Sequence, residues 1–342
     1  MPTFPEFWLR PTAVSCALLP IAWLFCAATA VRRGLYRLRL LPSVRLPVPV
    51  IVVGNLLVGG TGKTPLVLAL IDELRRAGYR PGVITRGYRG RSRSPALVSA
   101  GDDPAKAGDE AVLLARRGGC PVCAGSDRAA SARLLLRTHP ECDVLLSDDG
   151  LQHYRLARDL EISVEDRRGH GNGWMRPAGP LREPGGRRVD ARVVNGEPHA
   201  SRLGALGREG PWFRMSVEPQ GFHALEAPGI PVSAGALPGM RLHAVAGIGD
   251  PGRFFSMLRA MGLHATQHAF PDHHAFRAED LDFPECDAVL MTEKDAVKCE
   301  RLARKDARRG WYALQVGARL DPSFFDLILT RLQGAHHGHP AA

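Results

Sequence analysis

The chain contains 342 residues with a net charge of +10, and 45% of its residues are hydrophobic while 23% are charged. This balance predicts a folded globular protein and argues against a disordered one. The basic excess favours anionic partners such as phosphates and lipid headgroups. Aromatic residues, at 6%, offer few surfaces for base stacking, so we expect no nucleic-acid partner.

An uncharged run over residues 11–31 comes first, and arginines follow it at positions 32, 33, 37 and 39. Its length suits a membrane-spanning helix, although a cleaved signal peptide is the alternative because Ala28-Thr29-Ala30 resembles a cleavage site. Basic residues behind an apolar run keep that side in the cytoplasm. We therefore expect residues 1–40 to form a retained membrane-anchoring helix with a basic flank. The sequence leaves open whether it spans the bilayer or lies at its surface.

Strand and helix patterns alternate over residues 41–197, which predicts an α/β core with a doubly wound parallel sheet. We expect strands over 47–53, 80–85 and 143–146, and helices over 64–77, 109–117 and 127–137. Residues 86–108 and 166–190 are rich in glycine, proline and arginine, and this composition predicts loops.

A second, smaller α/β domain is expected over residues 241–342, joined to the core by a connecting region over 198–240. Its predicted strands are 243–248, 288–292 and 311–316, and its predicted helices are 252–261, 294–303 and 322–332. We expect the tail after residue 333 to be frayed.

A glycine-rich segment with a Gly-Lys-Thr sequence lies between the first strand and the first core helix, where a phosphate loop belongs. Glycine backbone can wrap around phosphates and turn N–H groups toward them. We expect ATP at this loop, with Lys63 at the β- and γ-phosphates and the Thr64 hydroxyl on Mg²⁺. The strict spacing asks for glycine where this chain has Leu57, so the motif is a variant. The predicted nucleotide-binding residues here are Gly59, Gly60, Thr61, Gly62, Lys63 and Thr64.

Two acids follow the strand over 143–146 and would complete such a site. A carboxylate at a strand tip can hold Mg²⁺ while its neighbour orients a second group. We assign Asp148 to the metal and Asp149 to catalysis.

The motifs taken together resemble those of the tetraacyldisaccharide 4′-kinase family of lipid A biosynthesis, over nearly the whole chain. The resemblance implies a P-loop NTPase-type fold. It also implies transfer of the ATP γ-phosphate, with Mg²⁺, to the 4′-hydroxyl of a tetraacylated glucosamine disaccharide 1-phosphate. The reaction would take place at the cytoplasmic face of the inner membrane, with the protein in contact with membrane lipids. The matching segments are 47–50, 53–55, 59–65, 85–88, 107–110, 147–153, 171–174, 177–183, 246–249, 271–273 and 291–298.

The same resemblance implies roles for residues outside the phosphate loop. Asp109 would act on the acceptor hydroxyl with help from His273, although the neighbouring His274 stays an alternative. Arg182 would lie near phosphate and Glu183 near the metal, and arginine suits that place because its planar fork matches phosphate oxygens. We expect the segment 292–295 to face the nucleotide or a hinge.

Two other classes of P-loop protein are weighed against the kinase. A membrane-associated partitioning-type ATPase carries a lysine just ahead of the glycine pair, where this chain has Val58. A GTPase would carry an Asn-Lys-x-Asp or Thr-Lys-x-Asp motif, and in Thr292-Glu-Lys-Asp295 the lysine comes one position too late.

Overall fold

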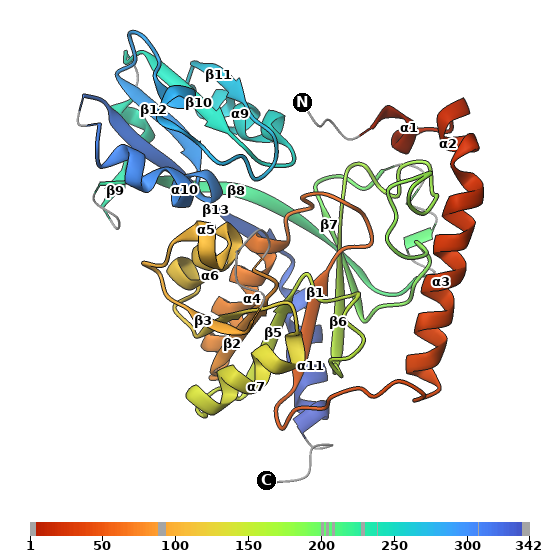
Figure 1. The fold of residues 1–342 in the computed structure, drawn as a ribbon. Coiled ribbons are helices and arrows are strands. Elements are labelled where there is room, and N and C mark those ends of the chain that lie inside the picture. The colour runs from red at the N-terminus through yellow and green to blue at the C-terminus, as the bar shows by residue number, and fades with distance from the viewer. Residues whose placement is uncertain are drawn as a thin grey trace.

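The computed structural model describes residues 5–87, 94–199, 202, 205–206, 209–226, 230–237, 239–306 and 308–336. Within this part of the chain the strands form one continuous sheet with two lobes, and helices cover it (Figure 1). Parts of the predicted loop over 86–108, of the connecting region over 198–240 and of the C-terminal tail lie outside the described residues.

The first lobe is the predicted α/β core. Its sheet runs in the order β7-β6-β1-β5-β2-β4-β3 and is parallel except for β3. The strands are β1 (Val50–Gly54), β2 (Pro81–Thr85), β3 (Ala96–Val98), β4 (Val122–Ala124), β5 (Val144–Asp148), β6 (Leu160–Asp166) and β7 (Ala191–Asn195), and the helices are α4 (Lys63–Arg76), α5 (Pro104–Ala107), α6 (Asp109–Gly118) and α7 (Arg128–Thr138).

Both faces of this sheet are buried, which explains why its central strands are continuously apolar. Ile51 and Val53 of β1 pack with α4 on one face, whereas Val50 and Val52 pack with α7 on the other. The prediction of a doubly wound α/β sheet is therefore confirmed.

The second lobe repeats the parallel arrangement. Its strands run in the order β11-β10-β12-β13, all parallel, with helices α9 and α10 packed on them. The elements are β10 (Leu242–Ala246), α9 (Pro251–Ala260), β11 (Ala265–Ala269), β12 (Ala288–Thr292), α10 (Glu293–Ala303) and β13 (Gly310–Leu320), with short 3₁₀ helices over Ala234–Ala236 and Ala278–Leu281.

The long strands β8 (Trp212–Ala224) and β13 join the lobes. β8 pairs in parallel with β7 of the core and antiparallel with β13 of the second lobe, and β9 (Pro231–Val232) adds to β8. The sequence prediction placed these residues in the connecting region over 198–240, and it did not include β8, whose Pro219 and Gly221 are unfavourable in a strand. The structure explains their presence: the ladder shifts register between Gln315 and Val316, opposite these residues, and such a bulge tolerates proline and glycine.

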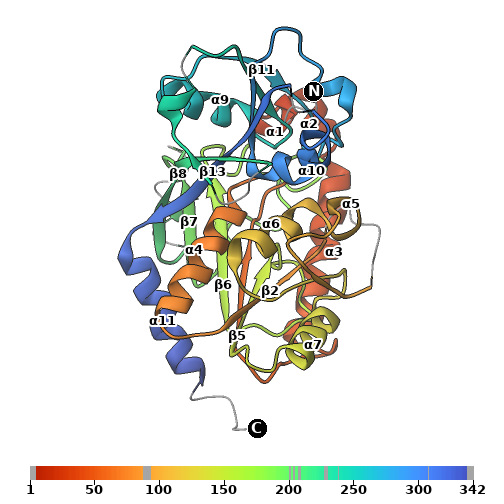
Figure 2. The same cartoon turned by 90° about the vertical axis from the view of Figure 1, so that its left-hand side faces the viewer.

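The last helix, α11 (Pro322–His336), returns to the core rather than staying with the second lobe. It lies beside α4, as Figure 2 shows, and its buried residues Phe324, Ile328 and Leu332 belong to the same apolar cluster as β1 and α4. The domain boundaries drawn from the sequence stay predictions, but the terminal helix clearly helps to close the core.

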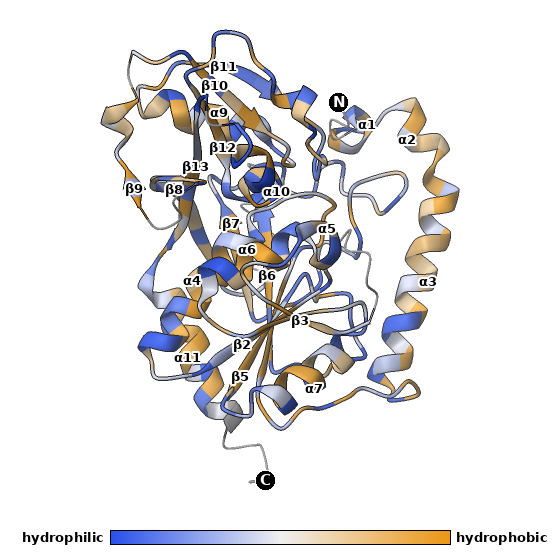
Figure 3. Ribbon diagram, turned by 60° about the vertical axis from the view of Figure 1, so that its left-hand side comes forward, coloured by the Kyte–Doolittle hydropathy of each residue, from blue (hydrophilic) through white to orange (hydrophobic). Residues whose placement is uncertain are grey.

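The N-terminal segment forms α1 (Glu6–Leu9), α2 (Ala13–Ala17) and α3 (Leu19–Arg37), and α3 runs along the outside of the core. Much of α3 is apolar, and its C-terminal end is basic (Figure 3). Trp8 donates from Nε1 to the Pro177 carbonyl at 2.9 Å, and Arg32 donates to the Gln152 carbonyl at 3.1 Å. Across the described ranges, no helix combines the length and the apolarity that crossing a bilayer requires. The expected membrane helix is therefore present as a helix but is not confirmed as a span.

Truncating Phe324 tests the packing of α11 on the core. The ring is fully buried and meets Phe213 of β8 edge-on, with centroids 5.3 Å apart. We expect Phe324→Ala to lower the free energy of unfolding by about 3–5 kcal/mol, measured by urea denaturation. The exposed Thr330→Ala on the same helix should change it little. A Phe324→Ala effect no larger than the control would contradict this packing.

Candidate active site

The phosphate loop joins β1 to α4 and is held from outside by side chains. Gly59 and Gly62 have φ values of 99° and 93°, which favour glycine because it lacks a Cβ. Asn55 donates to the Gly59 carbonyl and Asn195 to the Thr61 carbonyl, each at 3.0 Å. Because the loop's carbonyls are satisfied from outside, its N–H groups are available for phosphate oxygens.

The variant residue of the motif, Leu57, has a packing role. It is fully buried and bridges to Leu181, while the Arg182 amide donates to the Leu56 carbonyl at 2.7 Å. These contacts lay the loop over residues 177–183 alongside the start of the phosphate loop. The same pairing places Arg182 next to the strand-tip acids.

Asp149 lies between two cations. Lys63 Nζ is 3.4 Å from its Oδ1, and Arg182 Nη1 is 3.2 Å from the same oxygen. Burial raises the pKa of Asp149, but the charges of Lys63 and Arg182 outweigh burial and hold this pKa well below its usual range. Asp149 also has a positive φ of 49°, a strained conformation of the kind that clusters at functional sites.

Asp148, in contrast, is buried without a hydrogen bond from the described residues to its carboxylate oxygens, and the charges of Lys63 and Arg128 offset its burial only in part. It is 1% exposed, and neither of its carboxylate oxygens has a hydrogen-bond partner among the described residues. Burial, and then the nearby charge of Glu110, raise the pKa of Asp148 to about 7. Carboxylate oxygens are the ligands that Mg²⁺ prefers, so this unpaired group fits the predicted metal role.

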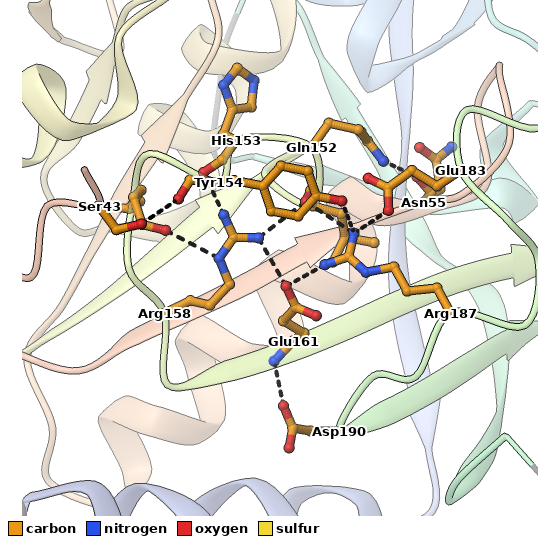
Figure 4. Close-up of polar contacts among 12 residues, drawn as sticks. Ser43, Asn55, Gln152, His153, Tyr154, Arg158, Glu161, Glu183, Arg187 and Asp190 are labelled. Atoms are coloured by element: carbon orange, nitrogen blue, oxygen red, sulfur yellow. Dashed lines mark hydrogen bonds and ion pairs between the residues drawn. The ribbon is translucent and has the colours of Figure 1, made fainter. Parts of the chain in front are cut away.

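Glu183 is held by a network of arginines (Figure 4). Its Oε2 accepts from Arg187 Nη1 at 2.8 Å, and Arg187 also donates to Glu161, which Arg158 approaches at 2.9 Å. Glu183 is 2% exposed, and within the described part of the chain its Oε1 has no hydrogen-bond partner. A fixed carboxylate with one free oxygen is consistent with a metal ligand, which stays a prediction.

The structure brings Asp109 and His273 together although 164 positions separate them along the chain. Asp109 is the first residue of α6, and His273 follows β11 in the second lobe. The His273 Nδ1 lies 2.9 Å from Asp109 Oδ2, whereas His274 contacts Asp280 and packs against Phe270. The geometry therefore selects His273 over His274 as the partner of Asp109.

A cavity of about 1400 Å³ is bordered by several of these groups, among them Asp149, Glu183 and His273. It is lined by the phosphate loop, by Asp149, by His273 from the second lobe, and by Phe25 and Arg32 from α3. Typical small-molecule sites occupy about 300–1,000 Å³, so the cavity is large enough for a nucleotide and part of a second, larger ligand.

The sequence assigned no individual role to some residues of the site, although Lys294 belongs to the segment 292–295 that is expected to face the nucleotide or a hinge. Arg128 is 2% exposed and donates to the Asp148 carbonyl at 3.3 Å, and burial lowers its pKa to about 10. Glu110 and Lys294 line the cavity and form an ion pair at 3.0 Å between the lobes. Arg128 could not be singled out among the many arginines of the sequence. The ion pair between Glu110 and Lys294 joins distant segments, so no local sequence pattern indicates it.

A phosphate loop at the carboxyl edge of a parallel sheet, facing a strand-tip acid pair, defines this protein as a P-loop nucleotide-binding protein. Its residues 14–333 match the family described as LpxK, tetraacyldisaccharide-1-P 4′-kinase. The chain belongs to this family of kinases, and the partitioning-type ATPase is not favoured.

Individual relatives agree with the family match. The chain is 50% identical to a tetraacyldisaccharide 4′-kinase of Azoarcus sp. (strain BH72), over all of this chain and 98% of that protein. It is 47% identical to the enzyme of the same name from Aromatoleum aromaticum, over 99% and 98% of the two chains. The crystal structure of LpxK from Aquifex aeolicus in complex with ATP is 30% identical and superposes with a TM-score of 0.77, over 93% of this chain and 99% of that one.

The raised pKa of Asp148 predicts a pH dependence for Mg²⁺. Since this pKa is about 7, the group is largely protonated at pH 6 and largely ionised at pH 8, and only the ionised form binds the cation. We expect the affinity for Mg²⁺, measured by titrating the nucleotide complex, to rise about tenfold over this range.

Two variants separate this effect from protonation of ATP itself. Asp148→Asn should weaken Mg²⁺ binding and lose the part of the pH dependence that belongs to the carboxyl group. Asp326→Asn, an exposed acid on α11, should behave as the wild type. Identical pH profiles for the wild type and Asp148→Asn would contradict the assignment.

Proposed function

We propose that this protein transfers the γ-phosphoryl group of ATP to the 4′-hydroxyl of a tetraacylated glucosamine disaccharide 1-phosphate. The observation that carries the proposal is the pairing of Asp109 with His273 beside the cavity, apart from the phosphate loop and the strand-tip acids. A nucleotide hydrolase needs only a positioned water, whereas a buried carboxylate aimed by a histidine suits a bulky acceptor with its own hydroxyl.

The phosphate loop and Lys63 would bind the nucleotide. Loop N–H groups and the Lys63 ammonium neutralise charge on the β- and γ-phosphates, and Arg182 supplies a second cation at 3.2 Å from Asp149. When bound, Mg²⁺ would neutralise phosphate charge further, with Thr64, Asp148 and Glu183 as the residues that would hold it. Asp149, kept ionised by Lys63 and Arg182, would fix the direction of these two cations.

Asp109 would accept the proton of the acceptor hydroxyl. The hydroxyl oxygen forms a bond to the γ-phosphorus, the bond from that phosphorus to the bridging oxygen breaks, and its electron pair leaves with ADP. The released proton moves to a carboxylate oxygen of Asp109. Burial raises the pKa of Asp109, but the hydrogen bond from His273 and the charge of Lys294 outweigh burial and hold this pKa below its ordinary value. The carboxylate therefore stays ionised and can accept a proton.

Replacing Asp109 separates binding from transfer. We expect Asp109→Asn to bind ATP with nearly unchanged affinity while kcat for the lipid falls by about 10²–10⁴-fold, since general-base help is lost in the transition state. His273→Ala should show a smaller defect of the same kind, and the double variant should be little worse than Asp109→Asn. Nucleotide titration and lipid-kinase rates on the same preparations measure both.

The comparison variant is Lys63→Ala, which should impair the nucleotide site itself. If Asp109→Asn instead loses ATP affinity while its bound fraction turns over normally, Asp109 belongs to the nucleotide site and the proposed role is wrong.

We further propose that the protein works at the cytoplasmic face of the inner membrane, with α3 lying on the lipid surface. Exposed apolar side chains on α3 support this, among them Ile21 at 54%, Trp23 at 66% and Leu24 at 72% exposure. A patch of this kind on a helix with a basic end suits an interfacial helix. Because Phe25 and Arg32 of α3 also line the cavity, an acylated substrate could enter from the bilayer without leaving its lipid surroundings.

A triple replacement of Ile21, Trp23 and Leu24 by serine tests this surface. Burial of a large apolar side chain contributes roughly 1.5–3 kcal/mol, so binding to vesicles that contain anionic lipid should fall more than about tenfold, with ATP affinity unchanged. Ile230→Ser, an exposed apolar residue elsewhere, is the control in the same sedimentation assay. Undiminished vesicle binding by the triple variant would show that another surface meets the membrane.

A further inference from the structure

We propose that Lys294 is a positioning residue that fixes the tautomer of His273, so that His273 presents an N–H to Asp109 and Asp109 alone receives the hydroxyl proton. The inference deepens the proposed function and rests on it for the role of Asp109. Its structural part, the placement of one proton, can be tested without any turnover.

Lys294 reaches three groups of the site from the start of α10. Its Nζ lies 3.2 Å from His273 Nε2, 3.0 Å from Glu110 Oε1 and 3.5 Å from Asp272 Oδ1. A cation in the first turn of a helix opposes the helix dipole. The residue therefore does not favour the helix on which it sits, and its contacts point to a role in the site.

The donors and acceptors around His273 favour one arrangement of protons. Asp272 Oδ1 also lies near Nε2, but at 3.8 Å it is beyond hydrogen-bond distance, whereas Lys294 Nζ at 3.2 Å is within it. An ammonium group has three donors and no acceptor, so Nε2 of His273 can meet Lys294 only through its lone pair. The proton of the neutral ring must then be on Nδ1, which lies 2.9 Å from Asp109 Oδ2. A doubly protonated ring would set an N–H against the ammonium group, and the other tautomer would do the same.

The ammonium form of Lys294 is secured by its surroundings. The side chain is 17% exposed. Burial lowers the pKa of Lys294, but Glu110, Asp109 and Asp272 together outweigh burial and hold this pKa above its ordinary value. The donor-only character on which the arrangement depends therefore persists throughout the physiological range of pH.

Ion pairs between α6 and α10 hold the parts in register. Arg116 of α6 contacts Glu300 of α10 at 2.6 Å, and Arg117 pairs with Glu293. Asp109 belongs to α6, so the same helix pair fixes the distance from Asp109 to Lys294. His273 is thereby enclosed between a carboxylate acceptor and an ammonium donor, each of which faces one ring nitrogen.

This arrangement of protons determines which group accepts the proton of the substrate hydroxyl. With its Nε2 lone pair engaged by Lys294, His273 cannot take the hydroxyl proton, so the histidine orients Asp109 and the carboxylate accepts. Asp109 Oδ1 already receives the Glu110 amide at 2.9 Å. Both oxygens are thus held in direction by N–H donors, and each keeps a lone pair for the substrate proton.

The test is ¹⁵N NMR of the histidine side chains in the full-length protein, with the His273 signals assigned by their loss in His273→Gln. We expect protonated Nδ1 and unprotonated Nε2 in the wild type at neutral pH. Lys294→Met should lose this fixed tautomer, lower kcat about 10–100-fold, the range typical for loss of an orienting partner, and leave ATP affinity unchanged.

Lys294→Arg keeps a donor-only cation and should restore the tautomer and much of the rate, and Lys305→Met on the exposed surface should match the wild type. A protonated Nε2 in the wild type, or an unchanged tautomer in Lys294→Met, would overturn the proposal. If the tautomer is as expected but the wild type does not phosphorylate the disaccharide, the proposed function fails while the placement of the proton stands.

Discussion

The antiparallel pairing of β8 with β13 is the constraint on which the site depends. It makes the sheets of both lobes one surface, with β8 also bonded to β7 of the core. The loop after β10 is thereby brought over the phosphate loop, where a Cβ on Gly249 would lie 3.1 Å from the Gly60 amide nitrogen. Asp109 comes from one lobe and His273 from the other, so the pair that would receive the acceptor exists only because this sheet is continuous.

The charged side chains of the site suit ligands that are themselves charged, namely a cation and a polyphosphate. Asp149 is balanced by Lys63 and Arg182, whereas Asp148 is buried beside it with no hydrogen bond to either oxygen among the described residues. Leaving a buried carboxylate unpaired costs stability, and natural proteins keep such groups mainly where function requires them. A cation and a polyphosphate would satisfy both the unpaired acid and the loop N–H groups, which links the local electrostatics to the chemistry of a kinase.

Local patterns made the nucleotide half of the site predictable from the sequence, because the phosphate loop is one continuous segment and Asp148 and Asp149 follow directly from a strand. The acceptor half came from family resemblance, and the choice between His273 and His274 needed the folded contacts, which place His273 at Asp109 and His274 at Asp280. Lys294 could not be assigned, since its partners lie on α6 and after β11, far away in the chain. β8 was missed because its proline and glycine are explained only by the bulge opposite Gln315 and Val316.

The central claim is that this phosphate loop serves an acceptor sugar and not a water molecule. The most direct measurement incubates the purified protein with γ-labelled ATP, Mg²⁺ and detergent-dispersed tetraacyldisaccharide 1-phosphate, and follows both the lipid mass and the labelled products. The account predicts that label moves to the lipid, that one phosphoryl group is added at the 4′-position, and that ADP forms in equal amount. Release of the label as free phosphate, with the lipid unchanged, would contradict it.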